Sequence, residues 1–386
     1  MLLGHMKDPR WPASEEALAD ARDFLTRLKD RRVVVAPHPS VDGLAAGALM
    51  LRALQALGAQ VMARVPGKGE HAFSPAFQQR LLAAPLDALV VLERGPRQTT
   101  SHSAPEPESS PGIPGGRSEA GGIAELSSSE GMDVSGAPPS VPTLIVAPQA
   151  ATAGNASTRV LSAQGMEPPV SCSLLTYALV SPCVVPGPLE WLAVLGTVAD
   201  QGVDAPIPFL KDALRRAGRT AVTESVSLLN AARKSSRFAA PLALGVLLRA
   251  GSATDITRGN VPGVDTLHDC RLEVQREVLR CSKTPPRIAS PVALLLFSSE
   301  AQVQSQVAVR WAQRLPEHII IAANAGYLPG RVDFAVRSRM PMGLGALPVH
   351  PTGGSLSRAD FLRFAAGLGF KGLRDLDVER RGAFPG

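Results

Sequence analysis

Short runs of β-branched and aliphatic residues alternate in this chain with Ala- and Leu-rich segments of helical length, and this alternation constrains the fold most. Val33 to Ala36 forms one such run, followed by the loop HPSVDG and a helical segment from Leu44 to Leu57. The order then recurs, with a strand expected at Gln60 to Arg64, a helix near Ala76 to Ala83 and an apolar strand ending at Glu93. Such alternation predicts a parallel sheet covered by helices, with ligand groups at the carboxyl ends of the strands.

The composition changes abruptly between residues 97 and 140. Ser, Pro, Gly and Glu dominate this segment, and large apolar residues almost disappear. A segment with so little apolar surface to bury does not order itself, so we expect a disordered insertion, which would bind protein partners in the alternative of an interaction module. The sheet resumes with the strand VPTLIVAP from Val141.

A helical section and then a second alternating section are expected after this strand. The helices of the first section are predicted at Ser171 to Val180, Leu189 to Asp200, Pro208 to Arg215, Thr223 to Lys234 and Pro241 to Arg249. A charged helix from Val264 to Arg280 is typical of a connector between domains. Strands and helices alternate again beyond it and end with a helix from Arg358 to Leu368.

These segments divide the chain into four parts. We expect an N-terminal helix in residues 1–30, a main domain in 31–255 that contains the insertion 97–140, a connector helix in 256–284 and a smaller α/β domain in 285–386. A chain of 386 residues with 45% hydrophobic content can build a core in each of two domains. The predicted fold class is therefore α/β, with a parallel sheet that carries helices on both faces and a second, smaller α/β domain.

Charge, aromatic content and cysteine spacing argue against several classes of protein. The net charge of +6 comes from basic residues scattered among acidic ones, which permits a phosphate-bearing ligand without requiring nucleic acid. Aromatic residues make up 4% of the chain, too few for the stacking surfaces of a single-strand coat protein. The cysteines lack the two-residue spacing of a zinc knuckle or a redox motif. Because we find neither a signal peptide nor an apolar run that could span a bilayer, we expect a cytoplasmic protein.

The candidate site residues of the main domain follow strands and helices. His38 and Asp42 lie on a loop that leaves a buried strand and enters a helix, so both side chains can converge above the strand end. The alternative is that Asp42 and Gly43 only make a turn and cap the helix. Glu93 ends another apolar strand, with a solvated strand end as its alternative. Asp200 ends a helix, where it opposes the helix dipole unless a ligand or cation is nearby, and a simple helix stop is its alternative.

Together these segments resemble the motifs of the DHH phosphoesterase family, in its RecJ-like form with a DHH domain and a DHH-associated C-terminal domain. The first loop is similar to the motif His-x-Asp-x-Asp-Gly, with Ser40 in place of the first Asp. DALVVLERG is similar to the second motif, with Glu93 in place of an Asp, and WLAVLGTVADQG is similar to the fourth, with Asp200 as its acid. In TLIVAPQ, residues 147–149 are Ala-Pro-Gln where the resemblance places Asp-His-His.

The C-terminal part resembles the DHH-associated domain, which contacts phosphate through an Arg on a strand and a Gly-rich turn that contains a His. Arg331 and Arg337 lie on the strand GRVDFAVRS, and His350, Gly353 and Gly354 lie in the loop VHPTGGSL. Guanidinium groups and glycine N–H groups suit phosphate because both donate hydrogen bonds at close approach. The alternative for the two arginines is a solvated strand face, since they alternate with the apolar residues of that strand.

The resemblance implies metal-dependent hydrolysis of phosphodiester or phosphoanhydride bonds in nucleotides or short oligonucleotides. One Mn²⁺ or Mg²⁺ ion would be held by His38 and Glu93, and the other by Asp42, Glu93 and Asp200. Each ion has lost a ligand relative to the family, so one ion instead of two, or none, is expected. Gln149 replaces a His near the scissile phosphate and cannot act as acid or base. We therefore expect an impaired hydrolase, with a non-catalytic phosphate-binding pseudoenzyme or a protein-interaction module as the alternatives.

Overall fold

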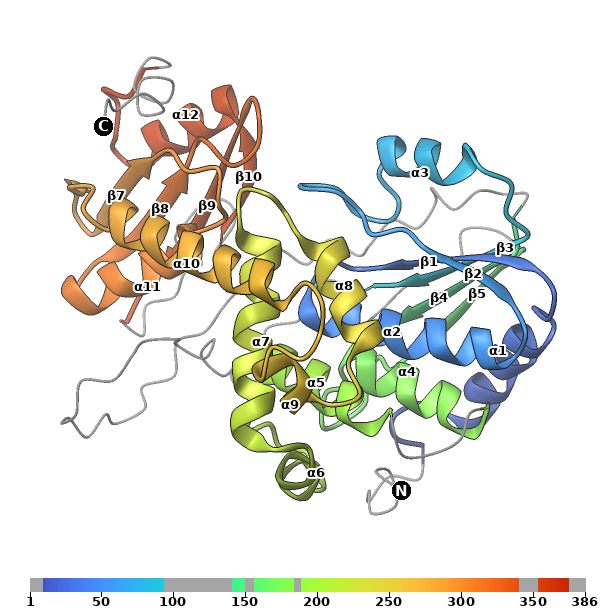
Figure 1. Ribbon diagram of the computed structural model, residues 1–386. Coiled ribbons are helices and arrows are strands. Elements are labelled where there is room, and N and C mark those ends of the chain that lie inside the picture. Colours follow the sequence, from blue (N-terminus) through green and yellow to red (C-terminus); the bar gives the residue numbers. More distant parts are fainter. Residues whose placement is uncertain (1–9, 94–140, 150–155, 184–188, 340–352, 375–386) are drawn as a thin grey trace.

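The computed structural model describes residues 10–93, 141–149, 156–183, 189–339 and 353–374. The predicted insertion at 97–140 and His350 lie outside these residues. Two five-stranded sheets, each covered by helices, form a main domain and a smaller second domain (Figure 1). The predicted α/β fold class is confirmed, while the predicted domain boundaries stay a prediction.

The sheet of the main domain has the order β2-β1-β3-β4-β5, and all its neighbouring strands are parallel. Its strands are β1 (Arg32–Pro37), β2 (Gln60–Ala63), β3 (Ala88–Leu92), β4 (Thr143–Ala147) and β5 (Thr158–Ser162). Every residue of β3 and β4 is buried, because helices cover both faces of the sheet. This burial explains why both strands are continuous apolar runs in the sequence.

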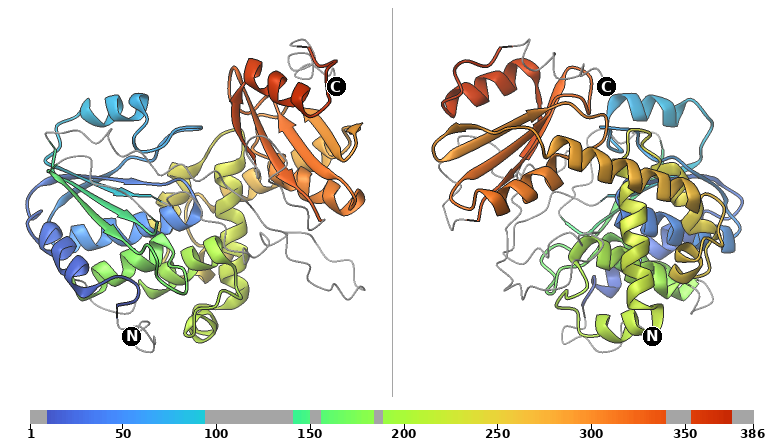
Figure 2. Two further views of the ribbon diagram at one scale, coloured as in Figure 1. Left: turned by 180° about the vertical axis from the view of Figure 1, so that it is seen from behind. Right: turned by 60° about the vertical axis from the view of Figure 1, so that its left-hand side comes forward.

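Successive residues of each central strand pack on opposite faces of this sheet. Val33 and Val35 contact the larger core with α1 (Glu15–Thr26), α2 (Val41–Ala56) and α4 (Cys172–Val180). Val34 and Ala36 face the smaller core with α3 (Pro75–Leu82). Figures 1 and 2 both show α3 on the side of the sheet opposite to the other helices.

A helical section connects this sheet to the second domain. Its helices are α5 (Glu190–Gln201), α6 (Leu210–Ala217), α7 (Arg219–Lys234), α8 (Ala240–Arg249), α9 (Ala253–Thr257) and α10 (Val264–Cys281). The predicted connector helix corresponds to α10, which packs against α7 of the main domain and α11 (Gln304–Arg314) of the second. Within the described ranges, no helix combines the length and apolarity needed to span a bilayer.

The second domain is a mixed sheet with helices on both faces. Its order is β10-β9-β8-β7-β6, in which only β7 and β8 pair in parallel. The strands are β6 (Arg287–Ala289), β7 (Val292–Phe297), β8 (Ile319–Asn324), β9 (Arg331–Arg337) and β10 (Gly353–Ser357). One face of the sheet packs with α10 and α11, and the other with α12 (Arg358–Gly367).

The prediction of a Gly-rich turn at Gly353 and Gly354 is wrong. Both residues belong to the edge strand β10, where they lie opposite Ala335 and Phe334 of β9. Gly353 has φ +128°, and a Cβ atom there would lie 2.4 Å from the carbonyl oxygen of Phe334. The glycine therefore permits a close approach of two strands, a requirement that a sequence motif for a phosphate turn does not distinguish.

Candidate functional site

His38 follows β1 and is held by the N-terminus of α2. Ser40 is the N-cap residue of α2, and its hydroxyl oxygen accepts a hydrogen bond from Gly43 N at 3.1 Å. Ser40 N donates to His38 Nδ1 at 3.1 Å. Because Nδ1 accepts this backbone hydrogen bond, the neutral imidazole carries its proton on Nε2. Ser40, which stands where the sequence resemblance places a carboxylate, therefore orients the His38 ring by donating its backbone N–H to Nδ1.

Asp42 lies in the first turn of α2, but its carboxylate binds a different helix. Its Oδ2 accepts from Cys172 N at 2.8 Å, and its Oδ1 accepts from Ser173 N at 2.9 Å. These are the first backbone N–H groups of α4, which have no partner within their own helix. Burial raises the pKa of Asp42 to about 7, and the negative charge of Asp200 adds to this increase. Asp42 thus joins α2 to α4 rather than capping its own helix.

Asp42, Glu93 and Asp200 gather around Cys172, and we call these three acids the carboxylate cluster. Burial raises the pKa of the Cys172 thiol well above its usual value, and the charges of all three acids raise it further. Glu93 is 4% exposed and its Oε1 accepts from Ala72 N at 3.3 Å. The three predicted acids therefore lie within electrostatic range of one buried thiol, and Glu93 is buried rather than at a solvated strand end.

Gln149 lies two residues beyond the end of β4. Its backbone carbonyl accepts a hydrogen bond from the Ser162 hydroxyl at 3.1 Å. Its side-chain Oε1 is buried and has no hydrogen-bond partner among the residues that the structure describes. Gln149 is therefore positioned mainly through its backbone.

Arg331 and Arg337 lie on one face of β9 but have different surroundings. Arg337 is 5% exposed, and its guanidinium group donates to the Val336 carbonyl at 2.8 Å and to the Ser305 hydroxyl on α11 at 2.9 Å. Arg331 is exposed and donates to the Ser355 hydroxyl at 2.8 Å and to the Ser355 carbonyl at 2.6 Å. The alternative of a solvated strand face is wrong for Arg337, because α11 covers that end of the strand.

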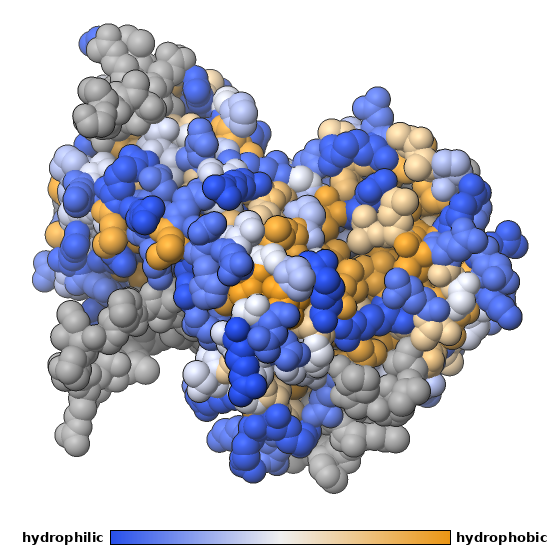
Figure 3. Space-filling model, viewed as in Figure 1, coloured by the Kyte–Doolittle hydropathy of each residue, from blue (hydrophilic) through white to orange (hydrophobic). Residues whose placement is uncertain are grey.

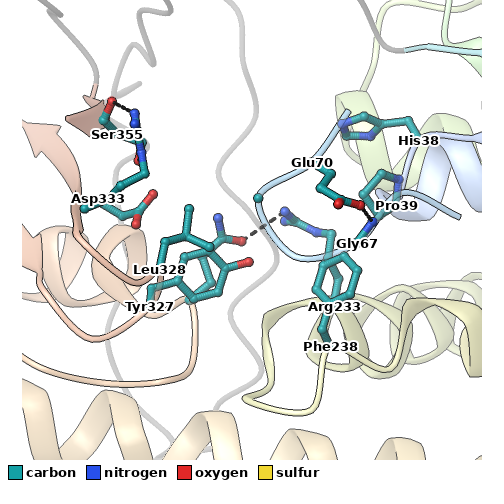
Figure 4. A pocket seen from close by; sticks show the side chains of 13 residues that line it. His38, Pro39, Gly67, Glu70, Arg233, Phe238, Tyr327, Leu328, Asp333 and Ser355 are labelled. Atoms are coloured by element: carbon teal, nitrogen blue, oxygen red, sulfur yellow. Dashed lines mark hydrogen bonds between the residues drawn. The ribbon is translucent and has the colours of Figure 1, made fainter. Parts of the chain in front are cut away.

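A cleft of about 400 Å³ lies between the two domains. The main domain contributes His38, Arg233 of α7 and the loop around Gly67 and Glu70, whereas the second contributes Arg331 and its neighbours on β9 and β10. Figure 3 shows the surface hollowed between the domains, and Figure 4 shows residues from both sides facing the same space. The carboxylate cluster and Arg337 are not among the described residues that line it. Of the predicted site residues, His38 and Arg331 therefore line the cleft, and the loop from His38 to Asp42 links it to the carboxylate cluster.

Direct contacts hold the two sides of the cleft together. Lys68 Nζ donates to the Glu300 carbonyl at 2.7 Å and lies 4.4 Å from the centre of the Tyr327 ring. Arg233 donates to Gln302 Oε1 at 3.0 Å. The loop that contains Lys68 has the composition of a surface turn, yet it contacts the second domain through these groups.

The donor groups do not match the two-metal centre that the resemblance implies. Both oxygens of Asp42 accept backbone N–H groups, and His38 Nδ1 accepts another. Throughout the described ranges, no group of three or more His, Cys, Asp or Glu side chains is arranged to hold a metal ion. In the geometry observed, the described residues do not fit two catalytic ions, which need several acids and His side chains turned toward a shared position.

Solved RecJ proteins share the two-domain fold of this protein over nearly the whole chain. Exonuclease RecJ bound to manganese matches with a TM-score of 0.59 and 16% identity, over 100% of this chain and 97% of that chain. RecJ of Thermus thermophilus in complex with Mn²⁺ matches with a TM-score of 0.60 and 17% identity, over 98% of this chain and 56% of that chain. The fold is RecJ-like DHH. The DHH domain of a member of the S1p family of ribosomal proteins also matches, with a TM-score of 0.63, 12% identity and coverages of 96% and 94%.

The RecJ-like DHH fold is a likeness of structure at low sequence identity. No family model matches the chain, and neither does any curated protein. The chain spans 56% of the length of Thermus thermophilus RecJ, the first of these structures. The comparisons therefore place the two domains in a known architecture and leave the activity to be inferred from the residues themselves.

Asp333 and Arg233 are among the cleft residues that the sequence analysis missed. Asp333 lines the cleft beside Arg331, and it occupies the same face of β9 because the two residues are two positions apart. The alternation of the strand RVDFAVR, which places Asp333 on the same face as Arg331, could have indicated Asp333 as a site residue. Arg233 lies in the last turn of α7, and only the approach of the second domain makes it part of the site.

Proposed function

We propose that this RecJ-like DHH protein binds a phosphate compound, a nucleotide or a short oligonucleotide, in the cleft between its domains without two-metal hydrolysis. The observation that carries the proposal is the Asp42 carboxylate, whose two oxygens are both hydrogen-bonded to the first turn of α4. An acid that fixes one helix to another in this way is a structural element. The cleft beside it keeps the groups that suit phosphate.

Those groups come from three separate elements. His38 follows β1, Arg233 ends α7 and Arg331 begins β9, and all three line the cleft. Guanidinium groups donate several hydrogen bonds in a fixed plane, and the His38 tautomer described above donates through Nε2. Donors that converge from both domains support binding of an anion between them, since charge-assisted hydrogen bonds to phosphate are short and strong.

Metal-dependent phosphoester hydrolysis is the second candidate, and the carboxylate cluster favours it. Burial next to Asp200 raises the pKa of Asp42 to about 7, so a bound cation would relieve an unfavourable concentration of negative charge. The RecJ structures with Mn²⁺ also favour it by analogy of fold. Binding of protein partners through residues 97–140 stays a prediction.

Binding and turnover can be measured on the same protein. We expect adenosine 5′-monophosphate and a short 5′-phosphorylated oligonucleotide to bind in isothermal titration calorimetry. Arg331→Ala should weaken this binding about tenfold, because it removes charge-assisted hydrogen bonds. The matched control is Arg215→Ala, since Arg215 is exposed on α6, where it pairs with Asp212. Binding that is unaffected by Arg331→Ala would contradict the proposal.

Hydrolysis is then assayed with the same compounds and Mn²⁺. We expect no product from the folded wild-type protein. Turnover that Asp42→Ala and Asp200→Ala both abolish would establish the second candidate instead, because both acids belong to the carboxylate cluster. Circular dichroism of each variant would show whether a loss of turnover reflects a loss of fold.

A further inference from the structure

One oxygen of the Asp333 carboxyl group is an unsatisfied hydrogen-bond acceptor among the described residues at the cleft. Asp333 is 6% exposed and lines the cleft from the middle of β9. The Ser355 hydroxyl donates to its carboxyl group, while Oδ2 is buried and has no hydrogen-bond partner within the described part of the chain. Figure 4 shows the carboxyl group facing the space next to Tyr327.

Nearby cations do not satisfy this acceptor. Arg331 directs its guanidinium group to the hydroxyl and carbonyl oxygens of Ser355, and Lys68 donates to the Glu300 carbonyl. A buried charged acceptor without a donor is costly, and such groups are rare in folded proteins. A purely structural Asp at this position would be expected to pair with one of these cations. The open oxygen instead suits a donor that enters the cleft with a ligand.

We propose that Asp333 accepts a hydrogen bond from a sugar hydroxyl of the bound nucleotide, so that the cleft selects ribonucleotides. This inference rests on the proposed function, with Arg331 as one of the phosphate-binding groups. Arg331 and Asp333 are two residues apart on one strand face, which separates their Cα atoms by roughly 7 Å. In a nucleotide the sugar is joined directly to the phosphate, whereas the base lies one ring further away.

The chemistry of the acceptor also favours a sugar. Carboxylates accept hydrogen bonds from ribose hydroxyl groups in dinucleotide-binding proteins, where the phosphate is bound separately by backbone donors. The 2′-hydroxyl is the group by which a protein distinguishes RNA from DNA. Asp333 adds a discriminating acceptor to a cleft in which His38, Arg233 and Arg331 serve the phosphate in the proposed function.

The test compares nucleotides that differ only in the sugar. Dissociation constants of adenosine 5′-monophosphate and its 2′-deoxy analogue are measured by calorimetry for the wild-type protein, Asp333→Asn and Asp212→Asn. We expect the wild-type protein to bind the ribonucleotide about tenfold more tightly, because the hydrogen bond involves a charged acceptor. The preference should disappear in Asp333→Asn and persist in Asp212→Asn, whose exposed Asp lies on α6.

Each outcome decides the inference. Equal wild-type affinities for the two sugars, or a preference that survives Asp333→Asn, overturn ribose selection and leave the proposed function standing. No binding of either nucleotide overturns both. Inosine 5′-monophosphate lacks the base amine of adenosine 5′-monophosphate. Its dissociation constant should lie within twofold of that of adenosine 5′-monophosphate, and a larger loss of affinity would assign Asp333 to the base. If Asp333→Asn fails to fold, the sugar and base comparisons on the wild-type protein decide the question.

Discussion

The carboxylate of Asp42 accepts the backbone N–H of Cys172 at 2.8 Å, although the two residues lie on different helices and 130 positions apart. This contact fixes the start of α4 to the start of α2 beneath the parallel sheet. Gly196 of α5 closes the arrangement, because a Cβ atom there would lie 2.8 Å from Asp42 Oδ1. An acid at the position of a catalytic motif therefore has a defined structural role.

Asp42→Ala should lower the free energy of unfolding by about 1–3 kcal/mol at pH 6, because the N–H groups of Cys172 and Ser173 would lose their acceptor inside the protein. Urea denaturation followed by circular dichroism measures the change. Asp212→Ala on the exposed surface of α6 is the control and should change stability by less than about 0.5 kcal/mol. Equal effects of the two substitutions would contradict the structural role of Asp42.

Stability should also depend on pH through Asp333. Burial raises the pKa of Asp333 to about 6, while the Ser355 hydrogen bond and the charges of Arg331 and Lys68 act in the opposite direction. Because the folded state keeps the proton longer than the unfolded chain, this stability is fully present below about pH 4 and is lost as the pH rises through 6.

Asp333→Asn, which cannot ionise, should therefore lose less stability than the wild-type protein between pH 5 and pH 8. The difference has an upper limit of about 1.4 kcal/mol per pH unit. Urea denaturation at both values measures it. An identical pH dependence of the two proteins would show that the carboxyl group titrates normally.

Lys68→Ala should loosen the contact between the domains without unfolding either one. The substitution removes the hydrogen bond to the Glu300 carbonyl and the cation–π contact with the Tyr327 ring, both of which bridge the cleft. Contacts of this kind contribute about 1 kcal/mol, so the unfolding free energy should fall by no more than that. Small-angle X-ray scattering should show a larger radius of gyration, while Lys211→Ala on α6 leaves it unchanged. An unaltered radius in Lys68→Ala would mean that other contacts hold the domains.

Substitution of Arg331 should affect mainly nucleotide binding, whereas substitution of Arg337 should affect mainly the free energy of unfolding. Arg337→Ala removes a buried side chain that hydrogen-bonds α11, so we expect the unfolding free energy to fall by about 1–3 kcal/mol. Arg331→Ala changes an exposed side chain and should cost less than about 1 kcal/mol, while nucleotide binding weakens. Thermal unfolding and calorimetry of both variants provide the comparison. The opposite pattern would place the phosphate at Arg337.

Local signals in the sequence predicted most of the elements. The helix expected at Thr223 to Lys234 corresponds to α7, and the connector expected at Val264 to Arg280 corresponds to α10, because helical periodicity and caps are carried by neighbouring residues. The edge strands β5, β6 and β10 were missed. β10 begins with two glycines and forms through pairing with β9, which no local pattern encodes.

The candidate site was predicted less completely, for a physical reason. That Asp42, Glu93 and Asp200 gather follows from the ends of strands and helices, which the sequence indicates. The acceptance of two α4 N–H groups by Asp42 depends on how α2 and α4 pack. The N-cap role of Ser40 is local, because its hydroxyl oxygen accepts from Gly43 N of the same helix. Contacts between distant elements decide which polar side chains stay available, and the pattern of one segment does not contain them.

The register of the edge strand β10 sets the spacing of the cleft. Ser355 lies opposite Asp333, accepts from Arg331 and donates to the Asp333 carboxyl group. A slip of one residue would turn this hydroxyl to the other face of the sheet and bring Leu356 or Gly354 into its place. Gly353, where no side chain fits, helps to prevent that slip. The positions of Ser355 and Asp333 in the cleft therefore depend in part on Gly353, a residue outside the cleft lining.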